Sequence, residues 1–188
     1  MHDITGKRIA ILSTHGFERS ELEVPRDRLT EAGAEVVIVA PKTGTIRGWD
    51  GDDWGGEAEA TLALSDAKVE DFDALVLPGG QINPDLLRVE NKAVQLVRGF
   101  FYAKKPIAAI CHAPWLLIEA EVLKGRKATS YHSIRKDVEN AGAHWLDEAV
   151  VCDEAIVTSR SPADLDAFCA KIAEEVAEGI HSDRAVAS

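Results

Sequence analysis

The sequence predicts an α/β fold in which a mostly parallel β-sheet lies between helices on both of its faces. Short runs rich in β-branched residues alternate with segments of helical composition along the whole chain. Two of the short runs, Ala74–Leu77 and Ile107–Ile110, are continuously apolar, which is typical of parallel strands that are covered on both faces. There is no internal repeat and no linker-like change in composition, so we expect one domain over residues 1–188.

The first half of the chain is expected to begin with a strand, a helix and a second strand. Lys7–Ser13 and Ala34–Ala40 are β-branched-rich runs that are flanked by turn residues, so both are predicted strands. Glu21–Ala32 is rich in charged helix formers and is predicted to be a helix that ends before Gly33. Further along the chain, apolar residues at helical spacing predict another helix over Asn91–Ala103.

The second half continues the alternation. The expected elements are a helix that opens at Pro114, a short strand at Ala128–Tyr131, a helix over Ile134–Asn140 and a pair of strands across Val150–Thr158. Ser161 and Pro162 are expected to start the final helix, with the serine as its N-cap and the proline at its first position.

One glycine-rich stretch, Gly44–Gly56, does not follow this pattern. It contains two of the four tryptophans, Trp49 and Trp54, and its composition suits either a hairpin or an irregular flap. A flap packed over a cleft or on a partner and a loop held by its own aromatic rings are equally compatible with this stretch.

Composition restricts the class of protein. The formal net charge is −11, whereas nucleic-acid binders usually carry a basic surface, and the one tight basic cluster, Lys124–Lys127, is interpreted as a solvated turn. This charge makes nucleic acid an unexpected partner. No export signal and no membrane-length apolar run is visible, so we do not expect a membrane as a partner either. Three irregularly spaced cysteines indicate free thiols in a reducing cytoplasm.

Residues that could take part in binding or catalysis follow three of the predicted strands. Thr14–Glu18 follows the first strand, Pro78–Gly80 the strand at Ala74–Leu77, and Cys111 and His112 the strand at Ile107–Ile110. Because the carboxyl ends of parallel strands meet at one edge of a sheet, we expect these groups to lie together there.

A reactive cysteine is one interpretation of this arrangement. A sharp turn between a strand and a helix would lift Cys111 out of the sheet, and the start of the helix would lower the pKa of its thiol. The amides of Gly79 and Gly80, with that of His112, could hold an oxyanion, and Glu18 supplies a carboxyl group.

A second interpretation is purely structural. Cysteine in an apolar strand is often a small core residue, which is our expectation for Cys152 and Cys169 and stays open for Cys111. Glu18 could simply lie at the start of a helix. Histidine and cysteine do not occur at metal-ligand spacing, and no metal or other cofactor is expected.

Taken together, these motifs resemble the PfpI family, which belongs to the superfamily of class I glutamine amidotransferase-like folds that also includes the Parkinsonism-associated deglycase. The resemblance covers roughly Lys7 to Ala177. It is carried by the blocks Gly16–Glu18, Phe72–Gly80, Lys105–Pro114, Leu123–Lys127 and Thr158–Leu165.

The resemblance implies a flavodoxin-like three-layer sandwich with Cys111 as the nucleophile. It implies that a protonated Glu18 donates a hydrogen bond to the sulfur and that His112 is the base. It also implies that Asp85 of a neighbouring subunit orients His112, so the protein would be a homo-oligomer, either a dimer or a hexamer. The sequence departs from the family pattern at Ala113, where a glycine is frequent, and Asp85 is shorter than the glutamate of some relatives.

Two functions follow as expectations. The first is a stress-protective, cysteine-dependent hydrolase or lyase with deglycase or glyoxalase action on methylglyoxal, other small carbonyl compounds or modified peptides and proteins, or with weak intracellular peptidase action. The alternative is a non-enzymatic sensor of oxidative stress or a chaperone that uses the reactive Cys111. His112 beside the thiol favours catalysis, because sensing alone does not require a base.

Overall fold

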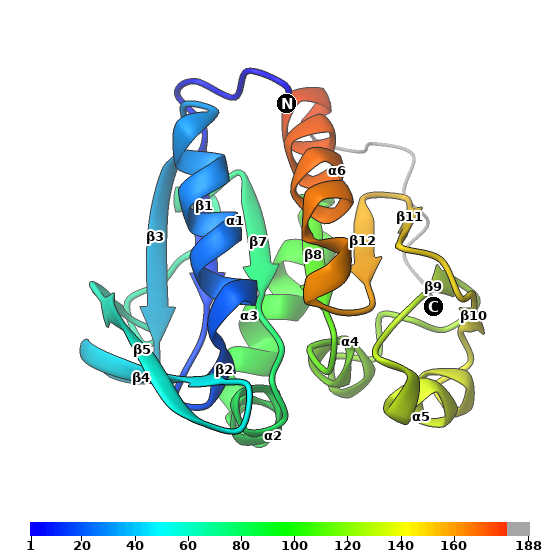
Figure 1. The fold of residues 1–188 in the computed structure, drawn as a ribbon. Coiled ribbons are helices and arrows are strands. Elements are labelled where there is room, and N and C mark those ends of the chain that lie inside the picture. The colour runs from blue at the N-terminus through cyan, green and yellow to red at the C-terminus, as the bar shows by residue number, and fades with distance from the viewer. Residues whose placement is uncertain (180–188) are drawn as a thin grey trace.

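A computed structural model describes residues 1–179 of the chain, and residues 180–188 of the expected domain lie outside the described residues. Its centre is a seven-stranded sheet with the order β11-β12-β8-β7-β1-β3-β6 (Figure 1). These strands are β1 (Arg8–Leu12), β3 (Glu35–Ala40), β6 (Leu62–Ala63), β7 (Ala74–Leu77), β8 (Ile107–Ile110), β11 (Val150–Asp153) and β12 (Ile156–Ser159). All neighbours are parallel except β11 and β12, which confirms the predicted α/β fold with a mostly parallel sheet.

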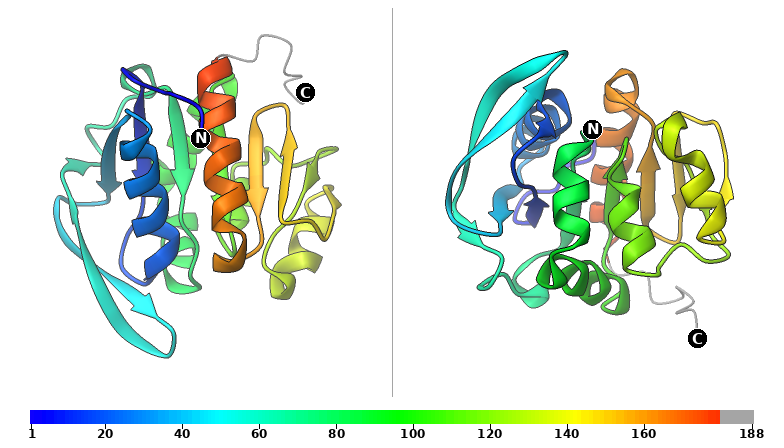
Figure 2. Two further views of the ribbon diagram at one scale, coloured as in Figure 1. Left: turned by 45° about the horizontal axis from the view of Figure 1, so that its top comes forward. Right: turned by 90° about the horizontal axis from the view of Figure 1, so that it is seen from below.

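Helices cover both faces of the sheet. They are α1 (Arg19–Glu31), α2 (Ile82–Arg88), α3 (Asn91–Tyr102), α4 (Pro114–Glu119), α5 (Arg135–Asn140) and α6 (Leu165–Glu178), with short 3-10 helices η1 (Val69–Asp71), η2 (His132–Ile134) and η3 (Pro162–Asp164). Helices α1 and α6 lie side by side on one face, and α3 lies on the other (Figures 1 and 2). Within residues 1–179, no helix combines the length and the apolar character that crossing a membrane requires.

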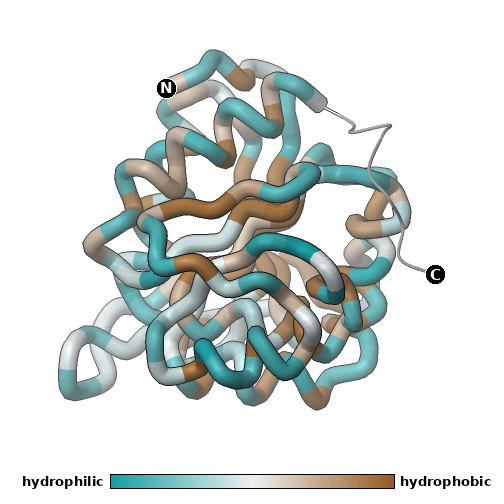
Figure 3. The backbone as a smooth tube through the Cα atoms, turned by 90° about the vertical axis from the view of Figure 1, so that its right-hand side faces the viewer, coloured by the Kyte–Doolittle hydropathy of each residue, from teal (hydrophilic) through white to brown (hydrophobic). Residues whose placement is uncertain are grey.

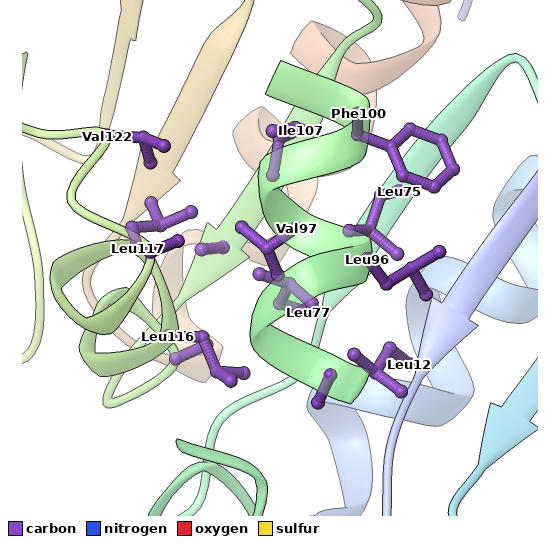
Figure 4. Close-up of a cluster of buried hydrophobic side chains, with 14 of the residues drawn as sticks. Leu12, Leu75, Leu77, Leu96, Val97, Phe100, Ile107, Leu116, Leu117 and Val122 are labelled. Atoms are coloured by element: carbon purple, nitrogen blue, oxygen red, sulfur yellow. The ribbon is translucent and has the colours of Figure 1, made fainter. Parts of the chain in front are cut away.

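The continuous apolar runs are explained by burial on both faces. Along β7, Ala74 and Val76 contribute to the hydrophobic cluster under α1 and α6, whereas Leu75 and Leu77 contribute to the cluster under α3. In the second cluster, Val97 of α3 packs over these leucines (Figure 4). The sheet therefore forms an apolar layer inside a more polar exterior (Figure 3).

Two predicted elements differ from the structure. The final helix α6 begins at Leu165, because residues 162–164 form the 3-10 helix η3, and the Ser161 side chain makes no capping hydrogen bond. The strand expected at Ala128–Tyr131 is shorter: β9 (Lys127–Ala128) pairs with β10 (His144–Trp145). Tyr131 leaves the strand because its amide donates to the carbonyl of Cys111 at 2.8 Å.

The glycine-rich stretch forms a hairpin of β4 (Gly44–Asp50) and β5 (Asp53–Ala60) that extends away from the main sheet (Figure 2). The short strand β2 (Phe17–Glu18) pairs with β4 and so joins the hairpin to the start of α1. The rings of Trp49 and Trp54 meet edge to face at 5.6 Å, and Trp49 Nε1 donates to the carbonyl of Gly51 at 2.8 Å. The hairpin is thus held by its own aromatic rings, as one of the two interpretations expected.

Candidate active site

Cys111 occupies a sharp turn at the carboxyl end of β8, directly before α4. Its φ of 63° lies in the left-handed region, which is unfavourable for a residue with a Cβ. The turn is held by the Cys111 amide, which donates to Ser159 at 3.0 Å, and by the Ala113 amide, which donates to Ile110 at 3.0 Å. The strained backbone directs the cysteine side chain toward the sheet edge where the other groups gather.

His112 contacts the thiol directly. Its Nδ1 lies 3.1 Å from the sulfur of Cys111, and its Nε2 lies 3.1 Å from the hydroxyl oxygen of Ser133. The ring stacks on Tyr131 at 4.9 Å and meets the edge of Trp115 at 5.3 Å. Both ring nitrogens therefore have a partner within the chain, and the imidazole is placed to exchange a proton with the thiol.

The carboxyl group beside the sulfur belongs to Glu21 of α1. Glu21 is fully buried, and its Oε2 accepts a hydrogen bond from the Gly79 amide at 2.9 Å. Its Oε1 has no hydrogen-bond partner among the described residues, and its charge acts on the Cys111 thiol. Burial, and to a smaller extent the charge of Glu18, raise the pKa of Glu21 to about 8. At neutral pH the group is therefore mostly protonated and can donate to the sulfur.

Glu18 does not have the role that the sequence analysis expected for it. It lies in β2, half-buried, and its carboxylate accepts from the Ser20 hydroxyl at 3.3 Å. It lines the cavity, but the fully buried carboxyl group that acts on the Cys111 thiol is that of Glu21, three residues later. A sequence signal for Glu21 did exist, because it precedes the buried Pro25 and Leu29 at intervals of four and so lies on the buried face of α1.

The two glycines have different roles. Gly79 was expected to help hold an oxyanion, but its amide already donates to Glu21. The amides of Gly80 and His112 do interact with the Cys111 sulfur and favour its anionic form. Gly80 has φ +78°, and a Cβ there would lie 2.7 Å from the Glu18 amide nitrogen, so a side chain at this position would collide with backbone.

The thiol does not have the low pKa that the sequence analysis expected. Burial, followed by the negative charge of Glu21, raises the pKa of Cys111, and the two amides oppose this. Burial and the nearby His132 lower the pKa of His112. The resting pair is therefore a thiol and a neutral imidazole. Protonation of Glu21 removes the charge that opposes ionisation of the thiol.

These groups line a cavity of about 480 Å³. Its wall includes the apolar or aromatic residues Trp49, Ile82, Tyr131 and Pro162. Trp49 thus reaches the cavity from the hairpin, which agrees with the interpretation of this hairpin as a flap over a cleft. A cavity of this size suits a small molecule or a single side chain.

Asp85 is exposed on α2, and no hydrogen bond joins it to His112 within residues 1–179. Two residues that contact His112, Ser133 and Tyr131, were not predicted as site residues from the sequence. No spacing signal relates them to Cys111, because a loop through α4 and β9 brings them back to the site. No group of three or more histidine, cysteine or acidic residues in the described part of the chain could hold a metal ion.

The chain is similar to known proteins in both sequence and structure. Residues 7–175 match the family model described as the DJ-1/PfpI family. General stress protein 18 of Bacillus subtilis is 46% identical over 165 residues, which cover 87% of this chain and 94% of that protein. Deglycase PfpI of Pyrococcus furiosus is 45% identical over 161 residues, which cover 86% and 94%. The crystal structure of Drosophila melanogaster DJ-1beta has a TM-score of 0.83 at 29% identity and covers 91% of this chain and 90% of that one.

Proposed function

Because the chain belongs to the DJ-1/PfpI family, we propose that it is a stress-protective, cysteine-dependent enzyme with deglycase or glyoxalase action on methylglyoxal or its adducts. The observation that carries this proposal is the 3.1 Å contact between the Cys111 sulfur and His112 Nδ1 at the wall of a small cavity. Relatives named as a general stress protein and as a deglycase support it.

The proposed chemistry uses the groups in the order of their contacts. His112 Nδ1 takes the thiol proton, and the thiolate forms a bond to the carbonyl carbon of the substrate while the carbonyl electron pair moves to oxygen. The Gly80 amide is placed to stabilise the resulting negative charge, and the Glu21 hydroxyl stabilises the thiolate before attack. His112 then returns the same proton to that oxygen, so the step adds the S–H group across the C=O bond and gives a neutral hemithioacetal on Cys111.

The size of the cavity favours compact carbonyl compounds and modified side chains over a folded protein. The test is a comparison of methylglyoxal, a methylglyoxal-modified peptide and casein as substrates. We expect turnover of the first two to exceed that of casein, with a Cys111→Ala protein as the blank. Casein as the best substrate, or turnover by the protein without the thiol, would contradict the proposal.

The alternative function is a sensor of oxidative stress or a chaperone, and the same contact is the observation that favours it. A thiolate formed beside His112, and stabilised by the Glu21 hydroxyl, is also the species that peroxide oxidises to a sulfenic and then a sulfinic acid. The two functions differ in their need for a base, so loss of His112 should affect catalysis but not sensing.

We also propose that the protein is a homo-oligomer in which a second copy covers α2. Ile82, Leu86 and Val89 are exposed apolar residues along one side of this helix, with exposed fractions of 36%, 48% and 79%, and Asp85 lies between them. Because Ser133 already occupies Nε2 of His112, Asp85 from another copy would act on His112 through the Ser133 hydroxyl.

Sedimentation in solution tests this assembly. The wild-type chain is expected to sediment as a dimer or a hexamer, and Leu86→Glu is expected to shift it toward the monomer because burial of a charge at an interface is costly. Tyr102→Glu, at another exposed hydrophobic position with 61% exposure, is the matched control and should leave the assembly unchanged. A wild-type protein that is a strict monomer would refute the assembly.

A further inference from the structure

Ser133 is the residue of the site that neither the sequence motifs nor the proposed chemistry uses. It lies in η2, and its hydroxyl oxygen is 3.1 Å from Nε2 of His112, while Nδ1 faces the Cys111 sulfur at the same distance. The imidazole is therefore held between a thiol on one side and a hydroxyl on the other.

This placement decides which tautomer can act as a base. A neutral imidazole carries one proton, and Nδ1 can accept the thiol proton only when that proton is on Nε2. The Nε2–H group then needs an acceptor, and the Ser133 oxygen is at hydrogen-bond distance. After proton transfer both nitrogens carry protons, so the same oxygen stabilises the imidazolium as well.

The segment that carries Ser133 is fixed to the site. The amide of Tyr131 donates to the carbonyl of Cys111 at 2.8 Å, and the amide of Ile134 donates to the carbonyl of Tyr131 at 3.1 Å. The Ile134 side chain is 2% exposed and anchors η2 in the core, while the Tyr131 ring stacks on His112. The hydroxyl is thus delivered by a preorganised segment rather than by a free loop.

We propose that Ser133 is the positioning residue of His112: it accepts the Nε2 proton and so orients the base within a single chain. This inference rests on the proposed function only in that His112 serves as the base for Cys111. It gives the base an orienting partner that does not depend on a second copy. The titratable groups near His112 are Cys111, Tyr131, His132 and, beyond the sulfur, Glu21.

The test is the rate at which iodoacetamide alkylates Cys111, measured by peptide mass spectrometry between about pH 5 and about pH 9. Ser133→Ala is expected to slow the reaction about tenfold at neutral pH, because a hydrogen bond to the charged imidazolium is lost, and to change the histidine-dependent limb of the profile. Ser133→Thr keeps the hydroxyl and is expected to recover the wild-type rate. Ser65→Ala is the matched control, because Ser65 is exposed and its hydroxyl donates to Asp66 instead of to a residue of the site.

A second measurement does not depend on any variant. The imidazole ¹⁵N shifts of His112 in the wild-type protein, recorded with the ring neutral, are expected to show the proton on Nε2. A proton on Nδ1, or a Ser133→Ala protein with the wild-type alkylation rate and pH profile, would overturn the inference. If none of the carbonyl substrates is turned over, the proposed function fails, but these two measurements still decide the role of Ser133.

Discussion

The substitution His112→Ala is expected to lower kcat/KM for the carbonyl substrate by about 10²- to 10⁴-fold, the usual effect of losing a general base. Burial raises the pKa of the Cys111 thiol, so at neutral pH the thiolate must be formed by proton transfer rather than by simple dissociation. His112 Nδ1, at 3.1 Å, is the group that receives the proton. The measurement is steady-state turnover of methylglyoxal or of a methylglyoxal-modified peptide, with circular dichroism to verify the fold.

His132→Ala is the matched control for this experiment. His132 is the neighbouring histidine in the site region, exposed and packed against Tyr131 at 4.3 Å, and it influences His112 only through its charge. Its removal should change turnover by a small factor. Full turnover by His112→Ala, together with selective oxidation of Cys111 by peroxide, would refute the enzyme and favour the sensor.

Glu21→Gln is expected to remove the alkaline limb of the pH–rate profile. In the wild-type protein the rate should rise as His112 loses its proton, below its ordinary pKa of 6.5 because burial lowers it. It should fall again near pH 8, where Glu21 ionises, stops donating to the sulfur and repels the thiolate. Glutamine keeps a donor but does not ionise, so the variant should stay active above pH 8. A profile for Glu21→Gln with an unchanged alkaline limb would contradict this assignment.

The same substitution is expected to stabilise the protein at neutral and higher pH. The pKa of Glu21 rises from 4.5 in the unfolded chain to about 8 in the folded chain, so the folded state holds the proton more tightly. The free energy of unfolding therefore falls as pH rises from about 4.5 to about 8, by on the order of 3 kcal/mol at pH 7. Glutamine avoids this loss, so the gain of Glu21→Gln should be large at pH 8 and should disappear near pH 4.

Urea unfolding at these two pH values measures the effect, and Glu18→Gln is the matched control. Glu18 is only half-buried and hydrogen bonds to Ser20, so its substitution should change the free energy of unfolding much less. If Glu18→Gln reproduced the stabilisation and the altered pH profile while Glu21→Gln did not, the assignment of the protonated carboxyl group would be wrong.

The sequence predicted the central sheet well because its strands have an unambiguous pattern. The bounds of β7 and β8 match their continuous apolar runs, since strands covered on both faces carry little polar sequence. Helix α2 was not predicted because it is only seven residues long and contains Pro84. The start of α6 was displaced because a proline and two following residues form a 3-10 turn, a choice that local propensity does not determine.

For the site, prediction was successful where the chemistry is local in sequence. Cys111 and His112 are adjacent and lie at a strand end, so the contact between them follows from the turn. The choice between Glu18 and Glu21 depended on which face of α1 is buried. Pro25 and Leu29, four and eight positions after Glu21, are buried and indicate that Glu21 lies on this face. The contact of Ser133 with His112 depends on how η2 is folded back onto the site, and no pattern in the sequence encodes that return.

Selective alkylation of the three cysteines at neutral pH tests the central claim most directly. Exposure alone would favour Cys152, which is partly exposed, over Cys111 and Cys169, whose exposed fractions are 6% and 0%. Burial raises the pKa of all three thiols, so the pKa alone does not favour Cys111, but neither Cys152 nor Cys169 has a histidine partner among the described residues. Because His112 can take its proton, Cys111 should be alkylated faster than both. If Cys111 reacts no faster than Cys152 and Cys169, the sulfur is core packing and the proposed chemistry is wrong.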